Sequence, residues 1–288
     1  MPEIAVQPPV PPLEPGDVPL SILIDYDGTI ALTDVSDTIT TEFLPPDLER
    51  ELGEAYVSGR IGSRETMARE VGLLPDDEAA IDRLVASQPH DPGFAPFFAR
   101  ARSDGIPIEV VSDGFGFFIP AAMAALGVED VTIVTARTTF HEGRPRIEFP
   151  NGHPTCFVCG TCKRQRVLAH RASGRAVLFI GDGESDRYAA GYSDFVFAKR
   201  ALVSICERSG WPYRTWEQFA EIDDWLAAAL TAWRESGRPP LTPRPVQFFC
   251  GPEVWGEGHT SPPDRTMFRR APGGESAPIG TDIDAREE

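Results

Sequence analysis

Short apolar runs recur through the middle of the chain and are separated by longer stretches of mixed polarity. Four of them are five or six residues long, at residues 20–24, 106–111, 131–135 and 176–180. Such runs are typical of strands buried on both faces of a sheet. Helices are predicted between or after them, at residues 94–102, 117–126, 163–172 and 217–233. Because strands alternating with helices favour right-handed crossovers, the pattern predicts an α/β fold with a Rossmann-like parallel sheet.

Residues 33–90 interrupt this alternation. They predict consecutive helices with no strand between them, at residues 37–43, 46–58, 63–71 and 76–86. Ligands of parallel sheets bind beyond the carboxyl ends of the strands. A helical block inserted after the first strand therefore predicts a small cap over that end of the sheet.

The two ends of the chain differ from the middle in composition. Residues 1–19 are rich in proline, which predicts a disordered or extended tail. Residues 236–288 are rich in Pro, Gly and charged residues and are expected to be mostly disordered. An apolar island at 248–255 could dock on another surface, and the alternative is a loosely attached tail. The predicted domains are a core and a cap, formed by residues 20–32 with 91–235 and by residues 33–90.

The balance of charge narrows the class of partner. The 288 residues include 27 Lys and Arg against 44 Asp and Glu, a net charge of −17. Such a surface repels nucleic acids and anionic membranes, and no stretch resembles a signal peptide or a membrane span. Three of the five cysteines, Cys156, Cys159 and Cys162, have a spacing unlike that of a disulfide framework, so a reducing cytoplasm is expected. The sequence indicates no oligomeric state.

The first predicted strand ends in two carboxylates. Asp25 and Asp27 share a face of an extended chain, so their repulsion requires a counter-charge. A divalent cation would supply it, since Mg²⁺ favours one or two carboxylates together with phosphate oxygens. Gly28 lets the chain turn sharply after the pair. The alternative is an acidic turn in which Asp27 caps a helix.

Two further polar groups suit a phosphate ligand. Ser112, Asp113 and Gly114 follow the second predicted strand, where a hydroxyl and free amides can hold phosphate oxygens. Lys163 opens a predicted helix and could screen the repulsion between phosphate and carboxylates. Taken singly, Ser112 could be a helix cap and Lys163 a solvated side chain.

A second acidic cluster, Asp182 with Asp186, lies in a Gly-rich segment after the strand at 176–180. It is expected to form the second half of a Mg²⁺ site, and its alternative is a capped turn between strand and helix. The four signals in this order are far more specific than any one of them.

This order of motifs resembles the haloacid dehalogenase-like hydrolase superfamily, in its phosphoserine-phosphatase-like branch, over residues 22–225. The resemblance implies that the helical insert is a C1-type cap. The segments 25–39, 159–163 and 195–219 look like the 2-hydroxy-3-keto-5-methylthiopentenyl-1-phosphate phosphatases of methionine salvage. Ser185 stands where phosphoserine phosphatases usually have Asn.

The resemblance implies a Mg²⁺-dependent phosphatase that hydrolyses a small phosphorylated metabolite through an aspartyl-phosphate. Asp25 would be the nucleophile and Asp27 the general acid and base, with a pKa raised by burial and nearby carboxylates. The implied metal ligands are Asp25, Asp182, Asp186 and the backbone carbonyl of Asp27. The implied phosphate ligands are Ser112, Lys163 and the amides of Asp113 and Gly114.

Two alternatives to hydrolysis remain open. One is a phosphotransferase on the same fold, and the other is a non-catalytic module that binds phosphate or a partner. The related phosphonatases require a Schiff-base Lys in the cap, and residues 33–105 contain no Lys. That variant is therefore disfavoured.

The cysteine cluster suggests a second metal. His153, Cys156, Cys159 and Cys162 could form a tetrahedral structural zinc site that stiffens the loop before Lys163. The alternative is a loop of reduced thiols.

Arg60, Arg64 and Glu70 in the cap could select the leaving group, and Asp34 and Asp37 could shape the entrance. A β-hairpin is predicted over residues 138–149, with its turn at Glu142 and Gly143. His141 and Arg144 in this hairpin could reach a substrate, and the alternative is that they are solvated at its tip.

Overall fold

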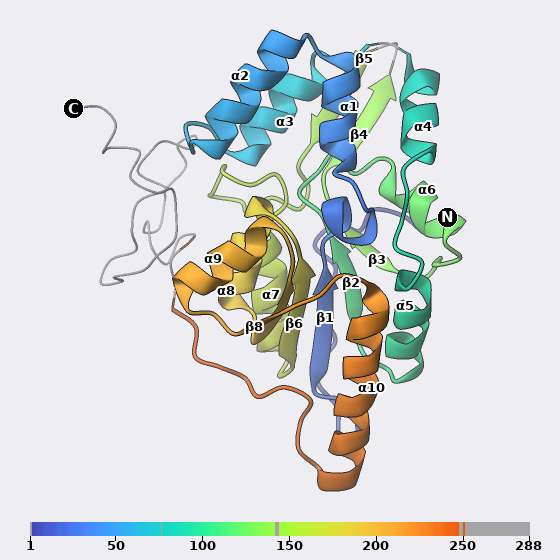
Figure 1. Ribbon diagram of the computed structural model, residues 1–288, viewed down its shortest axis with the longest axis vertical. Coiled ribbons are helices and arrows are strands. Elements are labelled where there is room, and N and C mark those ends of the chain that lie inside the picture. The colour runs from blue at the N-terminus through green and yellow to red at the C-terminus, as the bar shows by residue number, and fades with distance from the viewer. Residues whose placement is uncertain (1, 76, 142–143, 248–249, 251–288) are drawn as a thin grey trace, which may run out of the picture.

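The computed structural model describes residues 2–75, 77–141, 144–247 and 250 (Figure 1). Six parallel strands form one sheet in the order β3-β2-β1-β6-β7-β8. They are β1 (Leu20–Ile24), β2 (Ile108–Val111), β3 (Thr132–Val134), β6 (Ala176–Gly181), β7 (Phe195–Ala198) and β8 (Tyr213–Thr215). The predicted α/β fold with a parallel sheet is confirmed, and β7 and β8 are strands that the apolar pattern missed.

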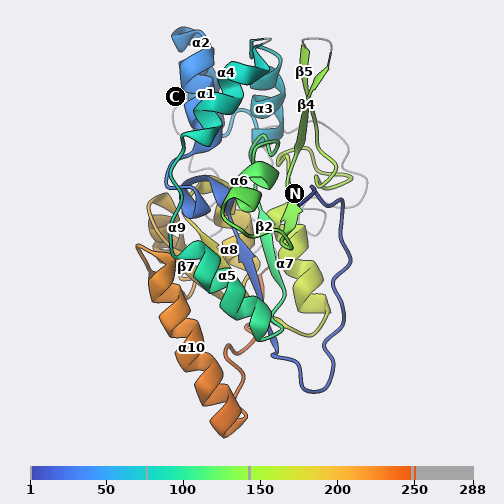
Figure 2. The ribbon, with the colours of Figure 1, turned by 90° about the vertical axis from the view of Figure 1, so that its right-hand side faces the viewer.

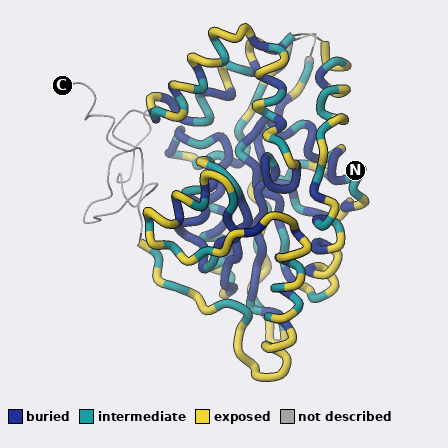
Figure 3. Tube along the Cα trace, in the orientation of Figure 1, coloured by how far each residue is buried: buried dark blue, intermediate teal, exposed yellow. Residues whose placement is uncertain are grey.

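Helices cover both faces of the sheet, because successive side chains of each buried strand point to opposite sides. Ile22 and Ile24 of β1 pack in one apolar cluster, whereas Leu23 packs in another. The first cluster includes residues of α5 (Phe94–Ser103), α6 (Ile119–Ala125) and α10 (Phe219–Ser236). The second includes residues of α7 (Lys163–Ala172), α8 (Arg187–Tyr192) and α9 (Ala201–Ser209). Figure 3 shows the buried sheet between these partly exposed helices.

The cap lies beyond the carboxyl ends of the strands (Figures 1 and 2). It consists of α1 (Val35–Phe43), α2 (Pro46–Val57), α3 (Ser63–Val71) and α4 (Glu78–Ala86). A hairpin of β4 (Arg137–His141) and β5 (Arg144–Glu148) lies beside α3. Its predicted turn at Glu142 and Gly143 lies outside the described residues, as do the side chains of His141 and Arg144.

The chain enters and leaves the cap at one place, the hinge, formed by residues 30–33 and 88–91. Ala31 and His90 form an antiparallel bridge. The amide of Leu32 donates to the carbonyl of Pro89 at 2.9 Å, and the amide of Asp91 donates to the carbonyl of Ile30 at 2.9 Å. The two crossings are therefore hydrogen-bonded neighbours.

The N-terminal segment is extended and lies against the core. Ile4 pairs with Ile133 of β3 in an isolated bridge. Farther along, the carbonyl of Pro8 accepts a hydrogen bond of 2.8 Å from Arg166 on α7. The contacts therefore tie this segment to β3 and to α7.

The described part of the C-terminal segment also contacts the core, through Arg244, which donates to the carbonyl of Ser193 at 2.7 Å. Apart from Cys250, the apolar island predicted at 248–255 lies outside the described residues. No helix in the described part of the chain has the length and apolar character needed to cross a membrane.

Candidate active site

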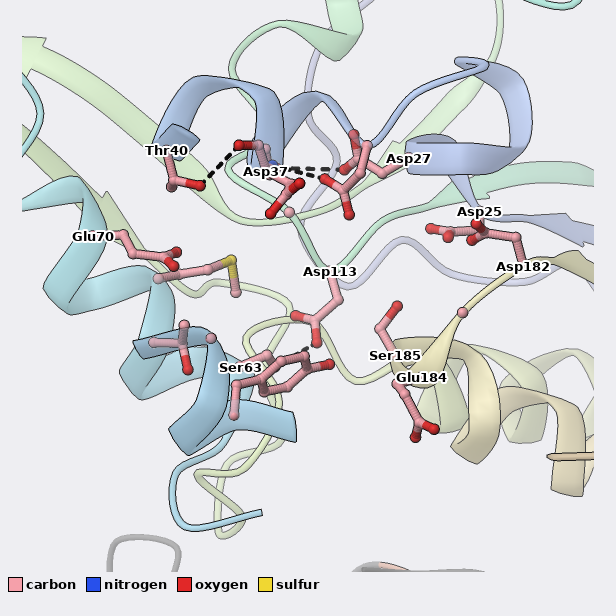
Figure 4. Close-up of a pocket in the computed structure, with 18 of the residues that line it drawn as sticks. Asp25, Asp27, Asp37, Thr40, Ser63, Glu70, Asp113, Asp182, Glu184 and Ser185 are labelled. Carbon is pink, nitrogen blue, oxygen red and sulfur yellow. Dashed lines mark hydrogen bonds between the residues drawn. The ribbon is translucent and has the colours of Figure 1, made fainter. Parts of the chain in front are cut away.

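Polar side chains converge at the carboxyl edge of the sheet, beneath the cap. Asp25 follows β1, Ser112 follows β2 and Asp182 follows β6, while Lys163 is the first residue of α7. Since β2, β1 and β6 are parallel neighbours, their carboxyl ends meet at the same edge. Figure 4 shows Asp25, Asp27 and Asp182 on one side of the cavity, facing cap residues such as Glu70 on the other.

A buried ion cluster forms the floor of the site. The Nζ of Lys163 lies 2.6 Å from Oδ1 of Asp25 and 2.7 Å from Oδ1 of Asp186. It also donates to Oγ of Ser185 at 3.2 Å. Asp25, Asp182 and Asp186 each offer a carboxylate oxygen within 4.8 Å of the other two. Three of the four predicted metal ligands therefore meet through their side chains.

Repulsion within this cluster changes the proton affinity of its members. Burial, and then the charge of Asp186, raises the pKa of Asp25 well above its usual range and that of Asp182 to about 6. Burial alone would lower the pKa of Lys163, but Asp186 and Asp25 outweigh it and raise that pKa. Lys163 therefore stays protonated beside carboxylates whose repulsion it only partly offsets.

The donor set fits a magnesium ion. Mg²⁺ prefers hard oxygen ligands and one or two protein carboxylates, and a divalent cation would offset the repulsion that, after burial, raises the pKa values of Asp25 and Asp182. Gly28, with φ of 67°, leaves the necessary space, because a Cβ there would lie 2.2 Å from Oδ2 of Asp182. Asp25, Asp182 and Asp186 would hold the ion.

The Asp27 side chain is separate from the three clustered carboxylates. Its Oδ1 accepts a hydrogen bond of 2.9 Å from the amide of Val35, at the start of the cap. Burial, followed by the charge of Asp34, raises its pKa well above the usual range, although the Val35 amide works against this shift. A carboxyl group that keeps its proton near neutral pH can donate it to a leaving group.

Ser112, Asp113 and Gly114, the three residues after β2, make different contacts. Ser112 is fully buried, and its Oγ accepts a hydrogen bond of 3.1 Å from the amide of Gly114. The carboxylate of Asp113 accepts from Oγ of Ser63 at 2.6 Å and from the amide of Thr161 at 2.8 Å. Asp113 therefore joins the core to cap helix α3, a side-chain role that the sequence did not indicate.

A cavity of about 250 Å³ extends from the ion cluster to the cap. Its cap side carries Asp34, Asp37, Glu49 and Glu70, and no Lys or Arg occurs among its described lining residues. Burial, and then Asp34, raises the pKa of Glu70 to about 7. The cap side of the cavity is thus strongly acidic.

The two cap arginines singled out by the sequence contribute elsewhere. The Nε of Arg64 donates to the carbonyl of Cys159 at 3.1 Å, and its guanidinium stacks on Phe149 and Phe157. Arg60 is exposed, and its Nε donates to Ser58. Arg64 therefore holds the cap to a core loop rather than lining the cavity.

The zinc expectation for His153, Cys156, Cys159 and Cys162 is not supported. Among the described residues, the group able to hold a metal is the carboxylate cluster, and the His and Cys residues form no such group. Cys156 is buried in an apolar cluster with Val158, and Cys162 is also buried. Burial raises the pKa of all three thiols, that of Cys162 to about 11. The three cysteines are free, in line with the alternative of a loop of reduced thiols.

One charged partner of the carboxylate cluster, Arg200, was not predicted from the sequence. The Nη1 of Arg200, two residues after β7, lies 3.0 Å from Oδ2 of Asp182. In the sequence, the basic pair Lys199-Arg200 follows a short apolar run. This run is β7, which ends at the same edge of the sheet as β1, so a strand predicted there would have placed Arg200 near Asp25.

Comparison with known proteins is consistent with this geometry. The family model described as haloacid dehalogenase-like hydrolase matches residues 22–191. A 2-hydroxy-3-keto-5-methylthiopentenyl-1-phosphate phosphatase of Exiguobacterium sibiricum is 31% identical over 214 residues, which are 72% of this chain and 96% of that protein. A probable phosphoserine phosphatase from Vibrio cholerae has a similar fold, with a TM-score of 0.58 and 17% identity over 76% of this chain and 68% of that one. A phosphoserine phosphatase solved as a phospho-aspartyl intermediate analogue gives a TM-score of 0.51 and 16% identity over 65% of this chain and 90% of that one.

Proposed function

The chain belongs to the haloacid dehalogenase-like hydrolase family, and from this premise we propose that it is a Mg²⁺-dependent phosphatase that forms an aspartyl-phosphate on Asp25. The observation that carries the proposal is the buried cluster in which Lys163 contacts Asp25 and Asp186, with Asp182 beside them. Pure binding of phosphate does not require a nucleophilic carboxylate with a protonated acid, Asp27, beside it.

The substrate we propose is a small phosphate monoester of the kind for which the relatives are named. The relative from Exiguobacterium sibiricum carries the name of a 2-hydroxy-3-keto-5-methylthiopentenyl-1-phosphate phosphatase. A cavity of about 250 Å³ suits a small metabolite rather than a macromolecule. An intermediate of methionine salvage is therefore the first substrate to test.

The first half of the reaction would transfer the phosphoryl group to the protein. A carboxylate oxygen of Asp25 attacks phosphorus, and the bond between phosphorus and the leaving oxygen breaks. That oxygen takes the electron pair and receives the proton of Asp27. Ser112, Lys163 and the amides of Asp113 and Gly114 would bind the phosphoryl oxygens, and magnesium, when bound, would add positive charge next to them.

The second half would return Asp25 to its starting state. Asp27, now ionised, removes a proton from a water molecule as that water attacks phosphorus, and the bond between phosphorus and the Asp25 oxygen breaks. Inorganic phosphate leaves, and Asp27 again holds a proton. The raised pKa of Asp27 suits this double role, because the group must be protonated at the start of each cycle.

Turnover of p-nitrophenyl phosphate, measured as release of inorganic phosphate, tests the proposal. We expect activity with Mg²⁺, none after chelation, and a loss of about 10³-fold or more in Asp25→Asn. Asp47→Asn changes an exposed cap aspartate and is the matched control. Turnover by Asp25→Asn at the parent rate would rule out the nucleophile, and phosphate found on an added alcohol instead of in solution would indicate a phosphotransferase.

A further inference from the structure

Arg200 connects two parts of the molecule that the proposed chemistry treats separately. Its Nη1 lies 3.0 Å from Oδ2 of Asp182, and its Nη2 donates to the carbonyl of Leu32 at 2.8 Å. Asp182 belongs to the carboxylate cluster, and Leu32 lies in the first crossing of the hinge. One guanidinium thus spans the candidate metal site and the entry to the cap.

The backbone at Arg200 is unusual for a residue with a side chain. Its φ of 51° and ψ of −131° lie in a region that L-residues rarely adopt. The surrounding contacts hold it there, since the amide of Leu202 donates to the carbonyl of Asp182 at 2.9 Å. Strained backbone that the surrounding structure enforces is common at functional sites, where it aims a side chain.

The loop after β1 is shaped to receive this pair of charges. A Cβ at Gly28 would lie 2.2 Å from Oδ2 of Asp182 and 2.5 Å from Nη1 of Arg200. Next to Arg200, the Nζ of Lys199 donates to the carbonyl of Thr29 at 3.4 Å and lies 3.9 Å from the ring centre of Trp216. Two successive basic residues therefore reach back to the loop between Asp25 and the cap.

We propose that Arg200 is a positioning residue that orients the Asp182 carboxylate for a metal ion and couples that carboxylate to the hinge of the cap. The inference rests on the proposed function, because it assumes that Asp182 is a magnesium ligand. Arg200 is not among the described residues that line the cavity; it acts through Asp182 on one side and through Leu32 on the other.

Two effects of Arg200 on metal binding oppose each other. Its positive charge repels a cation, but the side chain is half exposed (50%), so solvent screens this repulsion. The hydrogen bond fixes the rotamer of a carboxylate that is only 13% exposed, and partners that orient a metal ligand typically affect metal affinity by about 10–100-fold. Orientation therefore outweighs repulsion.

Calorimetric titration of the full-length protein with Mg²⁺, without substrate, tests the first half of the proposal. We expect the dissociation constant to rise about 10-fold in Arg200→Met and by less in Arg200→Lys, which keeps the charge but cannot bridge both partners. Arg208→Met, which removes an exposed arginine from α9, the helix that begins directly after Arg200, should leave the affinity unchanged. Unchanged or tighter binding in Arg200→Met would refute the orienting role.

Amide hydrogen exchange at the hinge tests the second half. Coupling between two sites is reciprocal, so Mg²⁺ should slow exchange of the Leu32 and Asp91 amides in the parent protein and have little effect on them in Arg200→Met. Equal slowing in both proteins would exclude coupling through Arg200. If the parent protein neither binds Mg²⁺ nor hydrolyses p-nitrophenyl phosphate, the proposed function fails and this inference falls with it. If the parent does both and Arg200→Met behaves like it, only this inference fails.

Discussion

Helix α7 carries two buried ion clusters that differ in charge balance. At its first residue, Lys163 contacts two carboxylates of the site, with Asp182 beside them. One and two turns later, Arg166 and His170 both contact Glu109 of β2. The first cluster gathers more negative charge than the described cations balance, whereas in the second a single carboxylate meets two basic side chains.

The difference in charge balance distinguishes a candidate metal site, the cluster at Lys163, from a cluster that stabilises the fold, the one at Glu109. The contacts of Arg166 with Glu109, at 2.9 and 2.6 Å, form a two-pronged ion pair, and its remaining nitrogen donates to the N-terminal segment at Pro8. Burial would raise the pKa of Glu109, but its contacts with His170 and Arg166 outweigh it and lower that pKa. In the first cluster the pKa of Asp25 is raised instead. Excess negative charge is what leaves the first cluster able to take up a metal ion.

The strongest test of the difference between the two clusters is to replace the basic side chain in each of them. Lys163→Met should lower kcat/KM with p-nitrophenyl phosphate by about 10³-fold, because the phosphoryl oxygens and the Asp25 carboxylate lose their positive partner. Arg166→Met, one turn along the same helix, should change the kcat/KM of the folded protein by less than about threefold. Steady-state kinetics on protein verified as folded by circular dichroism would check both, and similar losses in the two variants would erase the distinction.

The second cluster should instead respond in stability. Glu109→Leu leaves Arg166 buried without its carboxylate, which should cost about 3–5 kcal/mol of unfolding free energy. Denaturant unfolding measures this cost. The double variant Glu109→Leu with Arg166→Met removes both charges and should recover much of the loss. A double variant as unstable as Glu109→Leu alone would show that the pair does not account for the effect.

A smaller effect is expected at Asp27, the proposed general acid next to the first cluster. Its carboxyl group accepts a hydrogen bond from the amide of Val35. Asp27→Asn should lower kcat by about 10²-fold with an alkyl phosphate, whose leaving oxygen needs a proton. The loss should be smaller with p-nitrophenyl phosphate, whose leaving group departs as an anion. Equal losses with both substrates would count against the acid role.

The smallest effect concerns Glu70, a carboxylate on the cap side of the cavity. Its pKa is raised to about 7 from a usual value near 4.5, so ionisation destabilises the folded state as pH rises through this interval. Glu70→Gln imitates the protonated form. It should therefore raise the melting temperature by about 2–4 °C at pH 8 and by nearly nothing at pH 4.5. A shift that is equal at both pH values would mean that proton affinity is not the cause.

Much of the fold could be predicted because its central strands are continuous apolar runs. β1, β2, β3 and β6 were found in this way. β7 is an apolar run of only four residues, shorter than the runs of five or six that the pattern identified, and the three-residue edge strand β8 is partly exposed and gives no strong apolar signal. Their omission also hid Arg200, whose meaning depends on the edge at which β7 ends.

The candidate site was predictable where a residue's neighbours in sequence determine its place. Asp25 and Asp182 each stand at the end of a strand, so the topology of the sheet brings them together. The side chain of Asp113 could not be placed in this way, since its partners Ser63 and Thr161 come from the cap and from a distant loop. The zinc expectation is not supported, and spacing alone does not reveal that Cys156 packs in an apolar cluster.

The hinge makes the cap an exchangeable module. The amide of Asp91 is hydrogen-bonded to the carbonyl of Ile30, so the two points where the core chain meets the cap lie next to each other. This arrangement does not depend on the segment inserted between them. The entropic cost of closing such an insertion grows only slowly with its length. Evolution or an engineer could therefore replace the segment between these ends and give the molecule a new substrate range while leaving the chemical groups on the sheet in place.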